Sequence, residues 1–237
     1  MNTQPLLNDT PLLDVRELSV SFHKQAQIAV DRVSFSVHAG SITGLVGASG
    51  AGKSSIARAI MGLVKADSGE IRFRGEDIHS LPPRDLKTKR QRIQMVFQEP
   101  SASLSPRRTI EQSLLEPMQH FCLGDSTQQQ EKIRDTLATV GLDPDILGRY
   151  PHQFSSGQQQ RIAIARALVT SPDLLIADEA VSSRDVSIQA QILQLIKTLQ
   201  TEHNIAVLFI SHDLAAIAQV ADDIAVMLGG QLLEQSP

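Results

Sequence analysis

A glycine-rich stretch between Gly47 and Ser55 has the residue types needed to hold phosphate groups. It reads GASGAGKSS, follows the apolar stretch SITGLVG and precedes a helical pattern from Lys53 to Val64, which is the context of a Gly-x-x-x-x-Gly-Lys-Ser loop. Glycines let the backbone turn tightly, so that successive N–H groups surround an anion. We expect Lys53 to reach the β- and γ-phosphates of a nucleotide and Ser54 to bind Mg²⁺. The candidate phosphate-binding residues are Gly47, Ala48, Ser49, Gly50, Ala51, Gly52, Lys53, Ser54 and Ser55.

Two carboxylates follow a second apolar stretch. The segment DLLIADEA places Asp178 and Glu179 just past a predicted buried strand. We expect Asp178 to hold the Mg²⁺ shell through water, and Glu179 to act as a base for the attacking water or to orient it. Taken alone, adjacent Asp and Glu after a strand are more often a loop start or a helix cap. The glycine-rich loop in the same chain favours the catalytic interpretation.

Three more candidates lie at strand ends. His212 follows VLFIS, and Gln98 closes the predicted strand IQMVFQ, where it is a candidate for catalysis and for Mg²⁺ binding. In isolation, a structural histidine and a polar strand end are the commoner roles. Because ligands of open α/β sheets bind outside the carboxyl ends of the strands, we expect one nucleotide site there. Phe22 ends the first predicted strand, where it could stack on adenine or continue the buried face of that strand.

The stretch QFSSGQQQR, residues 153–161, begins another predicted helix. Ser155 and Gln158 fit a capping box, in which each side chain accepts a hydrogen bond from the backbone N–H of the other residue. The positive end of the helix, with its free N–H groups, could also bind a phosphate. The residues alone leave both interpretations open.

The composition limits the classes of function. The chain has 237 residues and a formal net charge of −4, which argues against nucleic acid as the main partner. Cys122 is the only cysteine, so no intrachain disulfide or cysteine-based zinc site is expected, as is typical of an intracellular protein. The sequence shows neither a signal peptide nor an apolar stretch long enough to span a membrane.

The order of predicted elements indicates an α/β fold. Strand patterns fill most of the first 98 residues, two helical patterns occupy residues 109–141, and strands alternate with helices after residue 157. Such alternation predicts a largely parallel core sheet.

The motif order resembles that of ABC transporter ATPases over almost the whole chain. MVFQEPSASLSPR is similar to a stretch of the oligopeptide, dipeptide and nickel importer branch, as are YPHQFSSGQQQRIAIARAL and DEAVSSRDVSIQAQIL. The resemblance implies a P-loop NTPase core with a mostly parallel sheet, an N-terminal antiparallel β part and an inserted helical subdomain. The implied division is residues 1–98 and 157–237 for the core and 99–156 for the helical subdomain.

The resemblance also implies cofactors and partners. ATP and Mg²⁺ are expected, with two ATPase subunits packed head to tail, so that Ser155, Ser156, Gly157 and Gln158 of one subunit contact the nucleotide of the other. Two transmembrane permease subunits and, indirectly, an extracytoplasmic solute-binding protein complete such an importer. The chain would then lie peripherally on the cytoplasmic face of the inner membrane and take up a peptide, nickel or a metal chelate.

Two residues depart from the family pattern. Ser156 replaces a glycine of the signature Leu-Ser-Gly-Gly-Gln, which would be costly if that position needs positive φ or if the partner's phosphate approaches it closely. Arg184, in SSRD, stands where an apolar residue would face the partner. The chain also ends at LLEQSP, where members of this branch usually continue. The alternatives are an accessory subunit with weak hydrolysis and a soluble ABC-type ATPase that acts on DNA or ribosomes.

Overall fold

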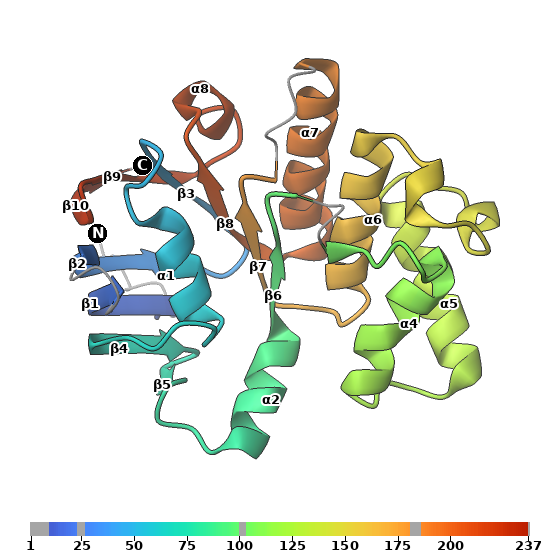
Figure 1. The fold of residues 1–237 in the computed structure, drawn as a ribbon, viewed down its shortest axis with the longest axis horizontal. Coiled ribbons are helices and arrows are strands. Elements are labelled where there is room, and N and C mark those ends of the chain that lie inside the picture. The colour runs from blue at the N-terminus through green and yellow to red at the C-terminus, as the bar shows by residue number, and fades with distance from the viewer. Residues whose placement is uncertain (1–9, 23–26, 100–102, 181–185, 237) are drawn as a thin grey trace, which may run out of the picture.

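A four-stranded antiparallel sheet forms the N-terminal part of the computed structural model, which describes residues 10–22, 27–99, 103–180 and 186–236 (Figure 1). In order across this sheet, its strands are β2 (Gln27–Val37), β1 (Leu13–Phe22), β4 (Ser68–Phe73) and β5 (Glu76–Asp77). Leu18 of β1 lies opposite Val33 of β2, and both side chains are buried. The strands predicted for this part of the chain are confirmed.

A second sheet has six strands and is parallel except at one edge. Its order is β10 (Gln231–Ser236), β9 (Asp223–Leu228), β3 (Ile42–Gly47), β8 (Ala206–Ser211), β7 (Leu174–Asp178) and β6 (Ile93–Val96), and only β10 runs antiparallel to its neighbour. The carboxyl ends of β3, β6, β7 and β8 therefore meet at one edge, and the P-loop, Gln98, Asp178, Glu179 and His212 lie at that edge.

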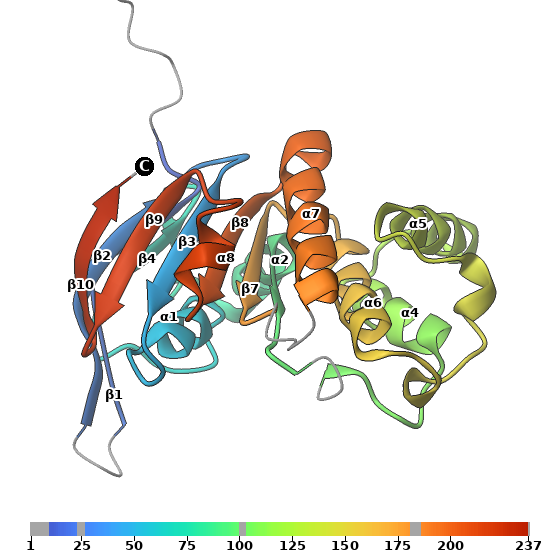
Figure 2. The ribbon, with the colours of Figure 1, turned by 90° about the horizontal axis from the view of Figure 1, so that it is seen from above.

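Helices cover this sheet and extend beyond it. They are α1 (Lys53–Ile60), α2 (Pro83–Arg92), α4 (Ile110–His120), α5 (Ser126–Thr139), α6 (Ser156–Leu168), α7 (Val186–His203) and α8 (Leu214–Ile217), with the 3₁₀ helices η1 (Pro144–Ile146) and η2 (Pro151–Gln153). In Figure 2, α6 and α7 lie between the sheets and the pair of helices α4 and α5. The expected α/β fold, with its antiparallel β part and its helical part, is confirmed. The division at residues 98 and 156 stays a prediction.

Three details differ from the sequence-based expectation. The strand predicted for residues 93–98 ends at Val96, where pairing with β7 also ends, so Gln98 lies two residues beyond the strand. The helix predicted from Lys53 to Val64 ends at Ile60, because Gly62 takes a left-handed conformation with φ 66°. The third difference is α2, which the sequence reading missed: it buries no residue and so has no apolar stripe to reveal it.

The described helices do not include a membrane span. None of those in residues 10–22, 27–99, 103–180 and 186–236 is both long and apolar enough to cross a bilayer.

Candidate nucleotide-binding site

The glycine-rich loop connects the carboxyl end of β3 to the start of α1. Gly52 caps α1 with φ 100°, and a Cβ added to it would overlap the carbonyl oxygen of Ala29. Gly50 also has positive φ, 81°, but a Cβ there would meet nothing within 4 Å. Gly52 is therefore required both by its conformation and by the close approach of β2, whereas Gly50 is required by conformation alone.

Lys53 is held inside this loop. Its side chain is buried, and Nζ donates hydrogen bonds to the carbonyl oxygens of Gly47, at 2.7 Å, and Ala48, at 2.9 Å. Burial lowers the pKa of the Lys53 ammonium, while the charges of Glu179 and Asp178 act in the opposite direction. The ammonium is thus fixed within the concave side of the loop, as a phosphate-binding lysine must be.

Ser54, at the start of α1, meets Asp178, the last residue of β7. Ser54 Oγ donates a hydrogen bond of 3.0 Å to Asp178 Oδ1, and Asp178 is only 5% exposed. Burial raises the pKa of the Asp178 carboxyl, and the bond from Ser54 partly offsets this. A hydroxyl and a carboxylate are hard oxygen ligands of the kind that Mg²⁺ takes beside substrate phosphates. These two residues fit a magnesium ion.

Glu179 follows β7 in an unusual conformation. Its φ is 49°, in the left-handed region that costs a non-glycine residue about 1–2 kcal/mol. Its backbone N–H donates to the carbonyl oxygen of Ile210 in β8, at 2.9 Å, which holds this turn against the next strand. The carboxylate Oε1 lies 3.4 Å from Nδ1 of His212, which follows β8. The candidate base Glu179 and the candidate His212 are therefore in contact.

These elements enclose a cleft of about 490 Å³, a size typical of sites for small ligands. The P-loop residues Ser49 to Ser55 line it, together with Gln98 and Glu179. Gln98 reaches the cleft although it is exposed and lies outside β6, so the error in the strand boundary does not remove it from the site.

Part of the cleft is lined by residues that the sequence did not predict. Ile28, Ala29, Gly229 and Gly230 line it. The backbone N–H of Asp31 donates to the carbonyl oxygen of Gly230, at 2.8 Å, which joins β2 to the turn between β9 and β10. The Gly-Gly pair predicts a turn, but nothing in the sequence shows that this turn faces the P-loop.

The helix start at Ser155 is separate from this cleft. The predicted capping box is confirmed: Ser155 Oγ accepts from the Gln158 N–H at 3.3 Å, and Gln158 Oε1 accepts from the Ser155 N–H at 3.1 Å. Ser156 is the first residue of α6 and does not have positive φ, so a side chain there costs no backbone strain. A Cβ added to Gly157 would lie 3.0 Å from Cγ2 of Ile188. Ser155, Ser156 and Gln158 are exposed.

The family model of the ABC transporter matches residues 30–182. This range is more than half of the chain and contains the P-loop, the capped start of α6, Asp178 and Glu179. The chain belongs to the ABC transporter ATP-binding family. It is an ABC-type ATPase.

Curated relatives of this ABC ATPase cover most of it. The oligopeptide transport ATP-binding protein AppF of Bacillus subtilis is 49% identical over 207 residues, which are 87% of this chain and 63% of AppF. The oligopeptide transport ATP-binding protein OppF of Streptococcus mutans is 44% identical over 231 residues, 96% of this chain and 75% of OppF.

Solved ABC cassettes share its fold. The structure of cbiO1 from Clostridium perfringens, part of the ABC transporter complex cbiONQ, superposes with a TM-score of 0.86 at 25% identity and covers 96% of this chain and 89% of cbiO1. A dimeric post-hydrolysis structure of the cassette MJ0796 bound to ADP and Pi has a TM-score of 0.83 at 25% identity, covering 94% of this chain and 97% of that one.

Two predicted residues of this ABC ATPase fall outside the structural description. Phe22 is the last residue of β1, but its side chain lies outside the described part of the chain, and so does Arg184. Stacking of Phe22 on adenine and the position of Arg184 at an interface stay predictions.

Proposed function

We propose that this chain hydrolyses ATP to drive the uptake of peptides across the cytoplasmic membrane. The observation that carries the proposal is the convergence of Lys53, Ser54, Asp178, Glu179 and His212 at the carboxyl edge of one parallel sheet. Peptide is preferred to nickel or a metal chelate, because the relatives AppF and OppF are named for oligopeptide transport.

Each residue has a role set by its surroundings. Lys53 and the N–H groups of the P-loop bind and neutralise the β- and γ-phosphates of ATP. Ser54 and Asp178, with Gln98 at the edge of the cleft, would hold Mg²⁺, which supplies further neutralisation of phosphate charge. Glu179 orients the attacking water and accepts its proton, and His212 acts beside it, in contact with its carboxylate.

The start of α6 acts on a second molecule in this proposal. Ser155, Ser156 and Gln158 are exposed and do not line the cleft of their own chain. Free N–H groups at a helix start attract phosphate. We place Ser155, Ser156, Gly157 and Gln158 against the nucleotide of a second ATP-binding subunit in a head-to-tail pair. The cassette MJ0796, which has the same fold, is dimeric.

A second concavity is the proposed contact with a permease subunit. It has a volume of about 370 Å³ and lies between β6 and the helices α4 and α6. Its walls combine apolar Met61, Met95 and Phe121 with charged Arg90 and Arg166, which suits an amphipathic protein segment. In the pair of ATP-binding subunits, each permease subunit would bind one such concavity. This contact would hold the chain at the cytoplasmic face of the membrane. The solute-binding protein would then act through the permeases. In this arrangement, residues 99–156 would form the helical subdomain.

The alternative of an accessory subunit with weak hydrolysis rested on Ser156 and Arg184. The helical conformation of Ser156 removes the cost of a positive φ, and close approach of the partner's phosphate to Ser156 stays a prediction. A soluble ABC ATPase acting on nucleic acid is disfavoured by the net charge of −4.

Reconstitution with the permease subunits tests the proposal. The chain should hydrolyse ATP in proteoliposomes, and peptide bound to the solute-binding protein should accumulate inside only when ATP is supplied on the side of this chain. A chain that turns over ATP without peptide uptake, in the presence of its permeases, would contradict the proposed substrate class. A folded chain without turnover would contradict the proposed activity.

A further inference from the structure

The loop that carries His212 leads into a short helix, and its histidine side chain is largely exposed. It joins β8 to α8, a helix of only four residues, and the His212 side chain is 57% exposed. Its contact with Glu179, at 3.4 Å, is longer than a strong hydrogen bond. The position of the imidazole must therefore be set largely by the residues next to it.

Asp213 links this loop to its surroundings on two sides. Its Oδ1 caps α8 by accepting hydrogen bonds from the N–H groups of Ala215, at 2.9 Å, and Ala216, at 3.2 Å. Its backbone N–H donates to Ser211 Oγ at 3.0 Å. The other carboxylate oxygen, Oδ2, accepts a hydrogen bond of 3.2 Å from Nε2 of Gln189 on α7. The Asp213 carboxylate thus joins the His212 loop to helix α7.

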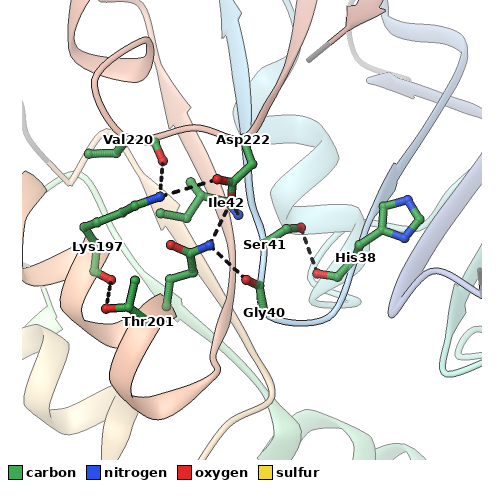
Figure 3. A network of polar contacts seen from close by, with 9 residues as sticks. His38, Gly40, Ser41, Ile42, Lys197, Thr201, Val220 and Asp222 are labelled. Atoms are coloured by element: carbon green, nitrogen blue, oxygen red, sulfur yellow. Dashed lines mark hydrogen bonds and ion pairs between the residues drawn. The ribbon is translucent and has the colours of Figure 1, made fainter. Parts of the chain in front are cut away.

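Helix α7 is a firm support for that link. Its buried face packs on the core through Ile192, Leu193, Leu195, Ile196 and Leu199. Near its far end, Gln200 donates to Gly40 O and to Asp222 Oδ2, both at 2.9 Å, and Lys197 lies 3.4 Å from Asp222 Oδ1 (Figure 3).

The same Asp222 joins α7 to the strand that leads to the P-loop. Its Oδ2 accepts from the N–H of Ile42, the first residue of β3, at 2.8 Å. The helix is therefore tied to the strand that ends at the P-loop, and Gln189 is held in place relative to the nucleotide cleft.

We propose that Gln189 is a positioning residue for His212. Its hydrogen bond to Asp213 holds the loop so that the imidazole stays beside Glu179. Gln189 does not line the cleft, so it acts through Asp213. The inference rests on the proposed function, in which Glu179 and His212 act together on the attacking water.

The test compares two glutamines of α7. Gln189→Met keeps the length of the side chain and removes the N–H donor, and Gln194→Met makes the same exchange at an exposed position of the same helix. We expect Gln189→Met to lower kcat for ATP about tenfold and to leave KM and calorimetric ATP affinity within about twofold. Gln194→Met should match the parent. Gln189→Lys, which retains a donor toward the Asp213 carboxylate, should recover most of the activity.

A double-mutant cycle separates positioning from a general effect on the fold. In a His212→Ala background, Gln189→Met should change kcat by less than about twofold. The same tenfold loss in both backgrounds would overturn the inference, because Gln189 would then act without His212. Parental turnover of Gln189→Met would overturn it too.

The NMR resonances of the His212 ring test the link from Gln189 to His212 independently of ATP hydrolysis. They are assigned by their absence in His212→Ala, and we expect them to shift in Gln189→Met and not in Gln194→Met. Unchanged resonances in Gln189→Met would overturn the inference. If they shift while His212→Ala turns over ATP like the parent, the link from Gln189 to the loop stands and the catalytic role of His212 in the proposed function fails.

Discussion

Gly50 and Gly52, two of the three glycines of the P-loop, separate the effect of backbone conformation from the effect of close packing. Gly50→Ala and Gly52→Ala both place a Cβ on a residue with positive φ, 81° and 100° respectively. This conformation costs a non-glycine residue about 1–2 kcal/mol. Only at Gly52 does the new Cβ also overlap a backbone atom, the carbonyl oxygen of Ala29, which belongs to a paired strand and has little freedom to move.

The additional cost at Gly52 follows from this overlap. Forcing an extra carbon into a packed region typically costs about 1–3 kcal/mol. For a protein of this size, 1 kcal/mol lowers the melting temperature by about 2–4 °C. We therefore expect Gly52→Ala to melt roughly 2–12 °C below Gly50→Ala, as measured by differential scanning calorimetry without nucleotide.

Binding should follow the same order. Gly52 precedes Lys53, so a displaced residue 52 moves the N–H groups and the ammonium that face the phosphates. Calorimetric titration with ATP should show a larger loss of affinity for Gly52→Ala than for Gly50→Ala. Equal melting temperatures for the two variants would contradict this prediction, because the contact with Ala29 would then contribute nothing to the conformation of the loop.

Two further predictions concern charge and the interface. Lys53→Ala should remove most ATP affinity in calorimetric titration, because the fixed cation inside the loop is lost. The circular dichroism spectrum should stay that of the parent. Near-parental binding by the folded variant would show that the P-loop assignment is wrong. Ser156→Gly should change hydrolysis at the site that contains the partner's P-loop and leave ATP affinity at Lys53 of this chain unchanged. This is read in the assembled transporter by inactivating one P-loop lysine at a time, and a change confined to the site of this chain's own P-loop would contradict the placement of Ser156 against the partner.

The site residues at strand ends were predictable, because a parallel sheet brings the carboxyl ends of its strands to one edge. Once β3, β7 and β8 are parallel neighbours, the residues that follow them share an edge, and the contacts of Ser54 with Asp178 and of Glu179 with His212 result from that arrangement. The capping box of Ser155 was predictable too, because it depends on residues only three positions apart.

The features that sequence reasoning missed depend on distant segments or lack a pattern. The wall of Ile28, Ala29 and the Gly229–Gly230 turn exists because β10 folds back beside β9 and the turn before it meets β2, and no local pattern encodes that meeting. The bond from Gln189 to Asp213 likewise joins two helices that are adjacent only in space. Helix α2 has the opposite difficulty, because an all-polar helix has no period to detect.

In the proposed function, Glu179, in contact with His212, acts on the water that attacks ATP. The measurement that tests it most directly is single-turnover hydrolysis by Glu179→Gln, compared with calorimetric ATP binding by the same variant. Loss of a base or of a water-orienting carboxylate lowers turnover by a factor on the order of a hundred or more. We expect this loss together with retained ATP affinity and accumulation of the ATP-bound closed pair. Turnover within about twofold of the parent would contradict it, because another group would then activate the water.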